Sequence, residues 1–373
     1  MKRTANRASS PEGVFAPLQP TSPNSTLPRP FHLLLFLCGA LWIAAAQGLA
    51  TRAAEGLTIR FNFSIFYDLV QQLFFLFLLL WGFATIRWIA TRSSTPSRIT
   101  IRATNALPSR PTSRQEWLRG IALGWGMLLA AIIPMMLRGS LHPEFNLSLS
   151  NFGFALLSLL TIAVSTLALE VAFRGFLFAE FIAATGPVFA TLFLALVYTT
   201  FASFHAGSTL LSTLITFFFA ILFSIAYLQT RALWVGWGIH FAWSAAATIL
   251  FGLPIAGADA YNNLIFTSVT GPTWLTGGPY GPQAAFFTFV VLIIAILVLY
   301  RITRQYAWDY TYHPPTAAGY PMDIAPPAAH TAMENAAAAA PAPLVQILST
   351  TPTASSTNPV IEDHLSRDPN STN

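Results

Sequence analysis

The sequence predicts an all-α protein, a polytopic membrane helical bundle of about eight transmembrane helices. Composition supports this prediction, because hydrophobic residues make up 54% of the 373 residues and charged residues only 9%. Charged residues make up roughly a quarter of an ordinary soluble domain. The apolar residues also gather in runs of about 20 residues, the length that crosses the hydrocarbon core of a bilayer. We therefore expect a multi-pass membrane protein.

Eight apolar segments carry this prediction. In chain order, spans are expected over 31–49, 66–90, 118–137, 152–184, 188–204 and 209–228, in a segment that contains 238–244 and ends before 252, and over 284–300. Gly120, Gly124 and Gly126 provide the third span with small surfaces for close packing against another helix. The preceding residues 115–117, which include Glu116, form an interfacial lead-in to that span.

Composition also divides the chain into four parts. Residues 1–30 and 305–373 are rich in proline, and we expect a disordered cytoplasmic arm and a disordered Pro/Ala-rich cytoplasmic tail. Residues 31–115 hold two spans and a basic linker, and residues 116–304 hold the other spans. The segment 254–282 is long and dense in glycine and proline, which is typical of a functional loop, and we expect a lid at the membrane surface.

Positive charge orients the predicted bundle. Arginines gather between residues 91 and 119 and near both chain ends, and cytoplasmic loops carry an excess of Lys and Arg. We therefore expect both termini in the cytoplasm, with the protein in a bacterial cytoplasmic membrane. The net charge of +5 comes mostly from such short segments, so nothing favours nucleic acid as a partner. Cys38 is the only cysteine, which excludes a disulfide framework and a cysteine metal cluster.

The fourth predicted span carries charged groups at an unusual depth. An ionised side chain in the hydrocarbon costs ~3 kcal/mol or more, so it usually faces a bundle interior or an aqueous cavity and marks function. Glu170 and Arg174 are four residues apart, which places them on one helix face where they can pair. A structural ion pair between helices explains this stretch alone equally well. Glu180, near the inner end, is expected to be a surface carboxylate, so Arg174→Leu is expected to destabilise the protein more than Glu180→Leu.

Two histidines, His205 and His240, belong to predicted spans close in sequence to Glu170. A carboxylate can take a proton from water, and imidazoles can stabilise the oxyanion that forms on a peptide carbonyl. The three residues are equally a His2Glu zinc set, and either histidine alone is more often a satisfied polar group in a helix interface. The three residues lie at different distances along their helices from the predicted cytoplasmic turns. They can therefore reach one depth in the membrane only if the helices are tilted or broken.

Three motifs in this order resemble those of the CPBP intramembrane proteases, the family of CAAX prenyl endopeptidases and bacteriocin-processing or immunity-type membrane proteins. The similar segments are Glu170-Val-Ala-Phe-Arg174-Gly175-Phe-Leu, Phe201 to His205, and His240-Phe-Ala-Trp-Ser244, within a resemblance that covers about Glu116 to Tyr300. The resemblance implies a protease in which Glu170 and His205 activate water, and His240 helps to hold the oxyanion. It further implies that Arg174 anchors the motif helix, that Ser244 supports the site and that no metal or other cofactor is required.

The chain departs from the family pattern at two positions. The family's first motif normally has paired glutamates, and Leu169 stands in place of the first, which is usually held to be catalytic. The third motif normally ends in asparagine or aspartate, and Ser244 stands at that position here. Serine can still donate a hydrogen bond, but its side chain is shorter than that of asparagine. Two hypotheses remain: an endopeptidase acting on membrane-associated protein or peptide substrates, or a catalytically inactive scaffold or immunity-type binding protein. A transporter with Glu170 as a proton relay is disfavoured because the chain lacks an internal repeat.

Overall fold

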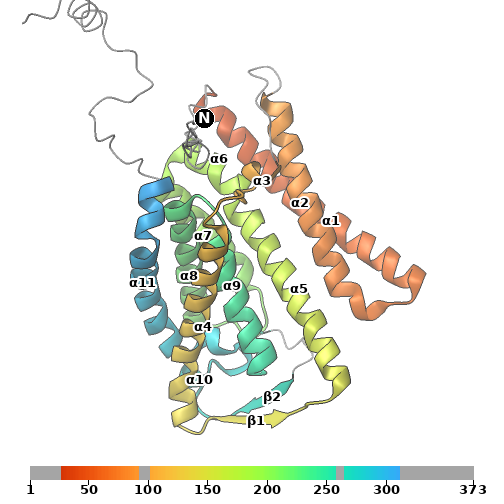
Figure 1. Cartoon of the computed structure of the whole chain (residues 1–373), viewed down its shortest axis with the longest axis vertical. Helices are drawn as coiled ribbons and strands as arrows, with labels where there is room; N and C mark the ends of the chain where they lie inside the picture. The colour runs from red at the N-terminus through yellow and green to blue at the C-terminus, as the bar shows by residue number, and fades with distance from the viewer. Residues whose placement is uncertain (1–26, 92–100, 258–263, 311–373) are drawn as a thin grey trace, which may run out of the picture. The chain divides into compact units, whose positions relative to one another are not determined.

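The computed structural model describes residues 27–91, 101–257 and 264–310, with side chains up to Ala307. Helices dominate these ranges, as Figure 1 shows. They are α1 (Arg29–Phe61), α2 (Tyr67–Thr91), α3 (Ile101–Thr104), α4 (Ser113–Leu137), α5 (Leu149–Arg174), α6 (Phe176–Thr185), α7 (Pro187–Ser203), α8 (Leu210–Thr230), α9 (Trp234–Ala245), α10 (Thr273–Thr276) and α11 (Phe286–Tyr310). A π-helical turn, Ala246–Leu250, continues α9, and three short 3-10 turns lie at Ser64–Phe66, Gly278–Tyr280 and Pro282–Ala284.

Six helical segments of the described chain are long and apolar enough to cross a membrane, namely α1, α2 with its preceding turn, α4, α5 with α6, α8 and α11. The predicted polytopic helical bundle is therefore confirmed. The two other predicted spans are shorter helices, because α7 has 17 residues and α9 has 12 before its π-helical turn. Seventeen residues rise ~26 Å, less than the ~30 Å hydrocarbon core.

Several predicted boundaries differ from the observed ones. The first helix continues to Phe61, well past the predicted end at residue 49, and α11 continues to Tyr310, past the predicted start of the tail at residue 305. The basic linker contains the short helix α3. The predictions for residues 1–26 and 311–373 lie outside the described residues.

Helices α4 and α9 pack closely enough that their glycines are required. A Cβ atom added to Gly120 would lie 2.3 Å from the backbone oxygen of Val235, and one added to Gly124 would lie 2.5 Å from that of Ile239. Both distances are far below van der Waals contact. The prediction of close packing is confirmed for these two glycines and is wrong for Gly126, where an added Cβ would meet nothing within 4 Å.

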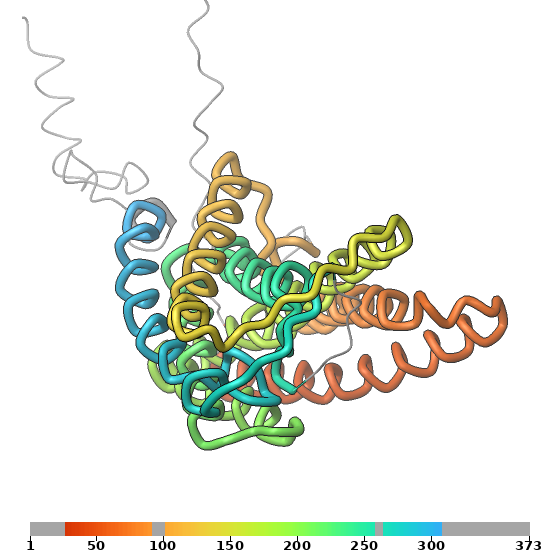
Figure 2. The backbone as a smooth tube through the Cα atoms, turned by 90° about the horizontal axis from the view of Figure 1, so that it is seen from below, coloured from red at the N-terminus to blue at the C-terminus, as the bar shows by residue number. Residues whose placement is uncertain are grey.

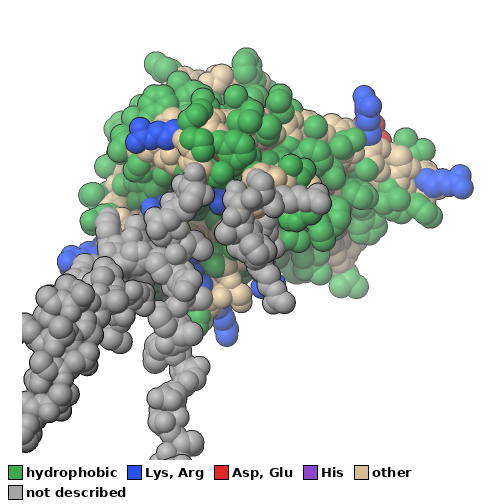
Figure 3. All heavy atoms as spheres, turned by 90° about the horizontal axis from the view of Figure 1, so that it is seen from above, with side chains coloured by type: hydrophobic (Ala, Val, Ile, Leu, Met, Phe, Trp, Pro, Cys, Tyr) green, Lys and Arg blue, Asp and Glu red, His purple; other side chains and the backbone are tan. Residues whose placement is uncertain are grey.

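Two groups of buried apolar side chains surround the site described below. One joins α4, α8, α9 and α11, and the other joins α1 and α2 to α5 and α6. At the surface, large apolar side chains remain exposed, among them Leu41 (73%) and Leu297 (68%). Figure 3 shows hydrophobic side chains over much of the visible face, with Lys and Arg at separate points. Such a surface suits a helical bundle surrounded by lipid.

A small sheet and an ordered part of the long loop lie beyond the helices. In the described residues, β1 (Leu141–Phe145) and β2 (Ile265–Val269) pair antiparallel, with Leu141 opposite Val269. Figure 1 shows the two strands side by side, and Figure 2 shows that end of the molecule from below. The sequence did not predict these strands. Tyr280, from the segment predicted as a lid, is 1% exposed and hydrogen-bonds with the Thr216 side chain of α8. Burial raises the pKa of the Tyr280 phenol.

Candidate functional site

The candidate site lies where the predicted fourth span breaks into α5 and α6. A single residue, Gly175, separates the two helices. A Cβ atom at this position would lie 2.5 Å from the backbone oxygen of Val171, so the break requires glycine. Arg174 is the last residue of α5, and Glu170 lies one turn before it. From the sequence we expect tilted or broken helices, because straight ones could not bring Glu170, His205 and His240 to one depth. The break at Gly175 is such an interruption.

Glu170 forms the predicted pair with Arg174 and also binds His240. The carboxylate is 1% exposed, and its Oε1 atom accepts hydrogen bonds from Arg174 Nη1 at 3.4 Å and from His240 Nδ1 at 2.9 Å. The Oε2 atom is buried and has no hydrogen-bond partner among the described residues. Gly236 leaves room beside it, because an added Cβ would lie 3.4 Å from Oε2. One carboxylate oxygen is thus held by protein donors and the other is not.

Arg174 is fixed on several sides. Its Nη2 atom donates a hydrogen bond to the backbone oxygen of Ala220 on α8 at 3.4 Å. The guanidinium carbon lies 5.0 Å from the ring centre of Tyr198 on α7 and 5.1 Å from that of Phe223 on α8. Cation–π contacts of this kind gain strength when the groups are desolvated, and Arg174 is 3% exposed. Arg174 therefore ties the end of α5 to α7 and α8.

His240 is held against the same aromatic ring. Its imidazole stacks on Phe223, with ring centres 4.9 Å apart and an angle of 22° between the planes. An ionised carboxylate only accepts hydrogen bonds, so His240 Nδ1 carries the proton in the contact with an ionised Glu170. This arrangement fixes the imidazole orientation and leaves Nε2 for a further partner. Ser244, buried and one turn further along α9, accepts a hydrogen bond at its backbone oxygen from Thr248.

His205 lies apart from this pair in the structure. It is exposed in the turn between α7 and α8, and its Nδ1 contacts the backbone oxygen of Ala202 at 3.1 Å. No hydrogen bond or ion pair among the described residues joins it to Glu170 or His240. The long loop packs on this turn, because a Cβ at Gly257 would lie 2.3 Å from the Ala206 backbone oxygen. The structure therefore brings together two of the three predicted residues.

Metal binding has no assembled ligand set in the described part of the chain. No group of three His, Cys, Asp or Glu side chains there is placed to hold a metal ion. Glu170 and His240 provide two such ligands, and His205 is not joined to them. The expectation of a site without metal stays a prediction.

Glu180 is not the surface carboxylate that the sequence predicted. It is 2% exposed, and its Oε2 atom contacts Nδ1 of His32 on α1 at 2.6 Å. Its Oε1 atom accepts a hydrogen bond from Arg87 on α2. The expectation that Glu180→Leu is milder than Arg174→Leu therefore loses its basis, because both changes break a buried pair. The sequence did contain a signal for this cluster, because His32 and Arg87 are ionisable residues within the first two predicted spans.

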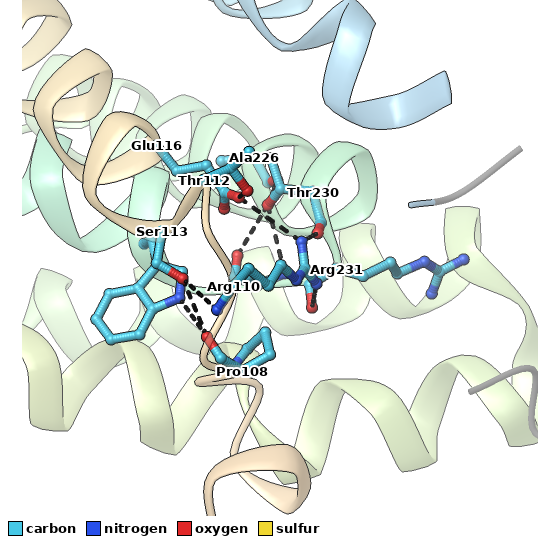
Figure 4. Close-up of polar contacts among 10 residues, drawn as sticks. Pro108, Arg110, Thr112, Ser113, Glu116, Ala226, Thr230 and Arg231 are labelled. Atoms are coloured by element: carbon cyan, nitrogen blue, oxygen red, sulfur yellow. Dashed lines mark hydrogen bonds and ion pairs between the residues drawn. The ribbon is translucent and has the colours of Figure 1, made fainter. Parts of the chain in front are cut away.

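Glu116 is also buried, although the sequence placed it in an interfacial lead-in. It is fully buried, its Oε1 atom accepts a hydrogen bond from the Thr112 hydroxyl at 2.7 Å, and Arg110 lies 3.8 Å away. Figure 4 shows Arg110 reaching the backbone oxygens of Thr230 and Arg231, to which it donates hydrogen bonds of 2.7 and 3.1 Å. The basic linker thus caps the end of α8, which is a structural role.

Comparison with known proteins identifies the central part of this bundle. Residues 151–246 match the family model described as type II CAAX prenyl endopeptidase Rce1-like. The matched segment begins inside α5 and ends just after α9, so it contains all three motifs, and it is narrower than the resemblance seen in the sequence. No curated protein and no solved structure matches the chain.

Proposed function

We propose that this chain, whose residues 151–246 belong to the CPBP family of CAAX-type intramembrane proteases, is an intramembrane endopeptidase that hydrolyses peptide bonds of membrane-associated protein substrates. The observation that supports this proposal is the state of Glu170. Its Oε1 atom is held by Arg174 and His240, while Oε2 has no partner among the described residues. A carboxylate oriented in this way is suited to act as a general base.

In the proposed reaction, Glu170 Oε2 takes a proton from a water molecule whose oxygen attacks the carbonyl carbon of the scissile peptide bond. The resulting oxyanion accepts a hydrogen bond from His240 Nε2 when the imidazole is protonated, because both ring nitrogens then donate. The carbon–nitrogen bond breaks as Glu170 returns the proton to the leaving amine. Arg174 keeps the carboxylate aimed through both steps, and Ser244 supports the segment of α9 that carries His240. No metal takes part in this scheme.

His205 enters the scheme as a second group that orients the attacking water. His205 is exposed in the turn after α7, so the scheme requires this turn to move toward Glu170 when substrate binds. Lid and loop motions of this kind commonly complete a catalytic arrangement. The contact of the long loop with Ala206 couples that turn to the predicted lid.

A second candidate function, an inactive membrane scaffold or immunity-type binding protein, is favoured by Leu169. This residue occupies the position of the family's first glutamate. Adjacent helical positions point about 100° apart, so a glutamate at the position of Leu169 and Glu170 could not both direct a carboxylate at one water without a shift of the backbone. The two functions therefore differ in whether Glu170 alone suffices as base.

The test is proteolysis by the full chain in lipid vesicles. The probes are a fluorogenic prenylated CAAX peptide and an unprenylated reporter with one transmembrane segment. We expect Glu170→Gln and His205→Ala each to lower cleavage by about 100-fold or more while leaving folded protein. Glu144→Gln, at an exposed carboxylate of β1, is the matched control and should cleave normally.

Two outcomes contradict the proposal. Cleavage that survives in Glu170→Gln removes Glu170 as the base. An inactive natural sequence combined with activity in Leu169→Glu favours the scaffold function.

A further inference from the structure

A second buried carboxylate, Glu180, joins α6 to α1 and α2, which are distant from it in the sequence. Its two oxygens are divided between His32 of α1, at 2.6 Å, and Arg87 of α2. His32 and Glu180 are 3% and 2% exposed, whereas Arg87 is 31% exposed. Ionisable groups inside membrane-spanning segments are costly and usually have a functional reason. The proposed reaction does not use this cluster.

Apolar contacts accompany the polar cluster along the same interface. Phe36 of α1 stacks on Phe181 of α6 with ring centres 4.3 Å apart, and Phe83 of α2 stacks on Phe176 at 5.2 Å. Both α1 and α2 lie outside the segment that matches the family model, whereas α6 lies inside it. The cluster is therefore a polar connection between the N-terminal helices and the family segment.

The orientation of α6 bears directly on the candidate site. Only Gly175 separates α6 from Arg174, and no loop absorbs a displacement between the two helices. The backbone oxygen of Val171 closes on Gly175 so tightly that no side chain fits. A rotation of α6 is thus transmitted to the last turn of α5, which carries Glu170 and Arg174.

We propose that Glu180, His32 and Arg87 are positioning residues through which α1 and α2 set the orientation of α6 and, across Gly175, the geometry of the Glu170–His240 pair. The two contacts fix the orientation of the Glu180 carboxylate relative to α1 and α2. A carboxylate accepts at both oxygens, and here each donor comes from a different helix. Without the negative charge of Glu180, the partly exposed Arg87 side chain is no longer held toward the interior by an ion pair. The kinetic part of this inference rests on the proposed function.

The test compares full-length variants in lipid nanodiscs. Glu180→Gln keeps the shape and removes the charge, Arg87→Gln removes the cation, Arg87→Lys retains a cation, and Glu144→Gln is the exposed control. The first readout is kcat and KM with the fluorogenic prenylated CAAX peptide. The second is the 15N resonance of the His240 imidazole in histidine-labelled protein, assigned by its loss in His240→Gln, which reports the hydrogen bond to Glu170 whether or not the protein cleaves.

We expect Glu180→Gln and Arg87→Gln to lower kcat by about tenfold with little change in KM, since small misplacements far from the chemistry reduce rate in this way. Both should shift the His240 resonance, whereas Arg87→Lys and Glu144→Gln should leave both readouts near those of the natural protein. If Glu180→Gln does not fold, Arg87→Gln carries the test. A folded variant without the cluster but with an unchanged His240 resonance overturns the inference. A natural protein that does not cleave, with the resonance shifted in the variants, refutes the proposed function alone.

Discussion

The contact between α4 and α9 allows two glycine-to-alanine changes on one helix to be compared. Gly124 faces α9, where an added Cβ would lie 2.5 Å from the Ile239 backbone oxygen, whereas at Gly126 it would meet nothing within 4 Å. We expect Gly124→Ala to be less stable than Gly126→Ala. Both changes gain the same helix propensity, about 1 kcal/mol, so the difference between them isolates the crowding.

The magnitude follows from the distance. The added carbon must move to ~3.5 Å from the oxygen, so α4 and α9 must separate locally by roughly 1 Å. Overpacking of this kind costs about 1–3 kcal/mol, and the same difference is expected between the two variants. His240 directly follows Ile239, so the displacement should also lengthen its 2.9 Å hydrogen bond to Glu170.

The measurement is the free energy of unfolding of the two purified variants, taken by denaturant titration in mixed micelles and followed by tryptophan fluorescence. The natural protein sets the reference, and Gly126→Ala should equal or exceed its stability. Equal stability of Gly124→Ala and Gly126→Ala would refute the close helix contact from which this magnitude is worked.

Arg174→Leu should lower the free energy of unfolding by about 3–5 kcal/mol, because it leaves Glu170 buried without its cation, whereas the exposed Arg60→Leu should change it little; equal values in the same titration would show that the pair does not form. Gly175→Ala should destabilise the protein by about 1–3 kcal/mol, because its Cβ would meet a backbone oxygen at 2.5 Å, and a neutral result would place the α5–α6 break elsewhere. Reporter fusions should give a cytoplasmic signal at Thr112 and at the C-terminus and an outside signal at Asn146; an outside signal at Thr112 would reverse the predicted orientation.

The sequence alone determined the class of the protein and the contacts that lie within one helix. Composition and run length identified a helical membrane bundle, since water-soluble folds do not bury so many apolar residues in such long runs. The pair formed by Glu170 and Arg174 followed from their spacing, because residues four apart share a helix face whatever the rest of the fold does. The three ordered motifs likewise pointed to the family that the comparison found for residues 151–246.

The tertiary structure decided which helix faces meet. Glu180 was predicted to reach the surface, yet it is buried by partners 148 and 93 residues away in the sequence. His240 reached Glu170 whereas His205 did not, because the break at Gly175 and the turn after α7 set where each helix end lies. Helical periodicity is a local property of the chain, but the choice of partner face depends on packing between whole helices, and no spacing within one helix encodes it.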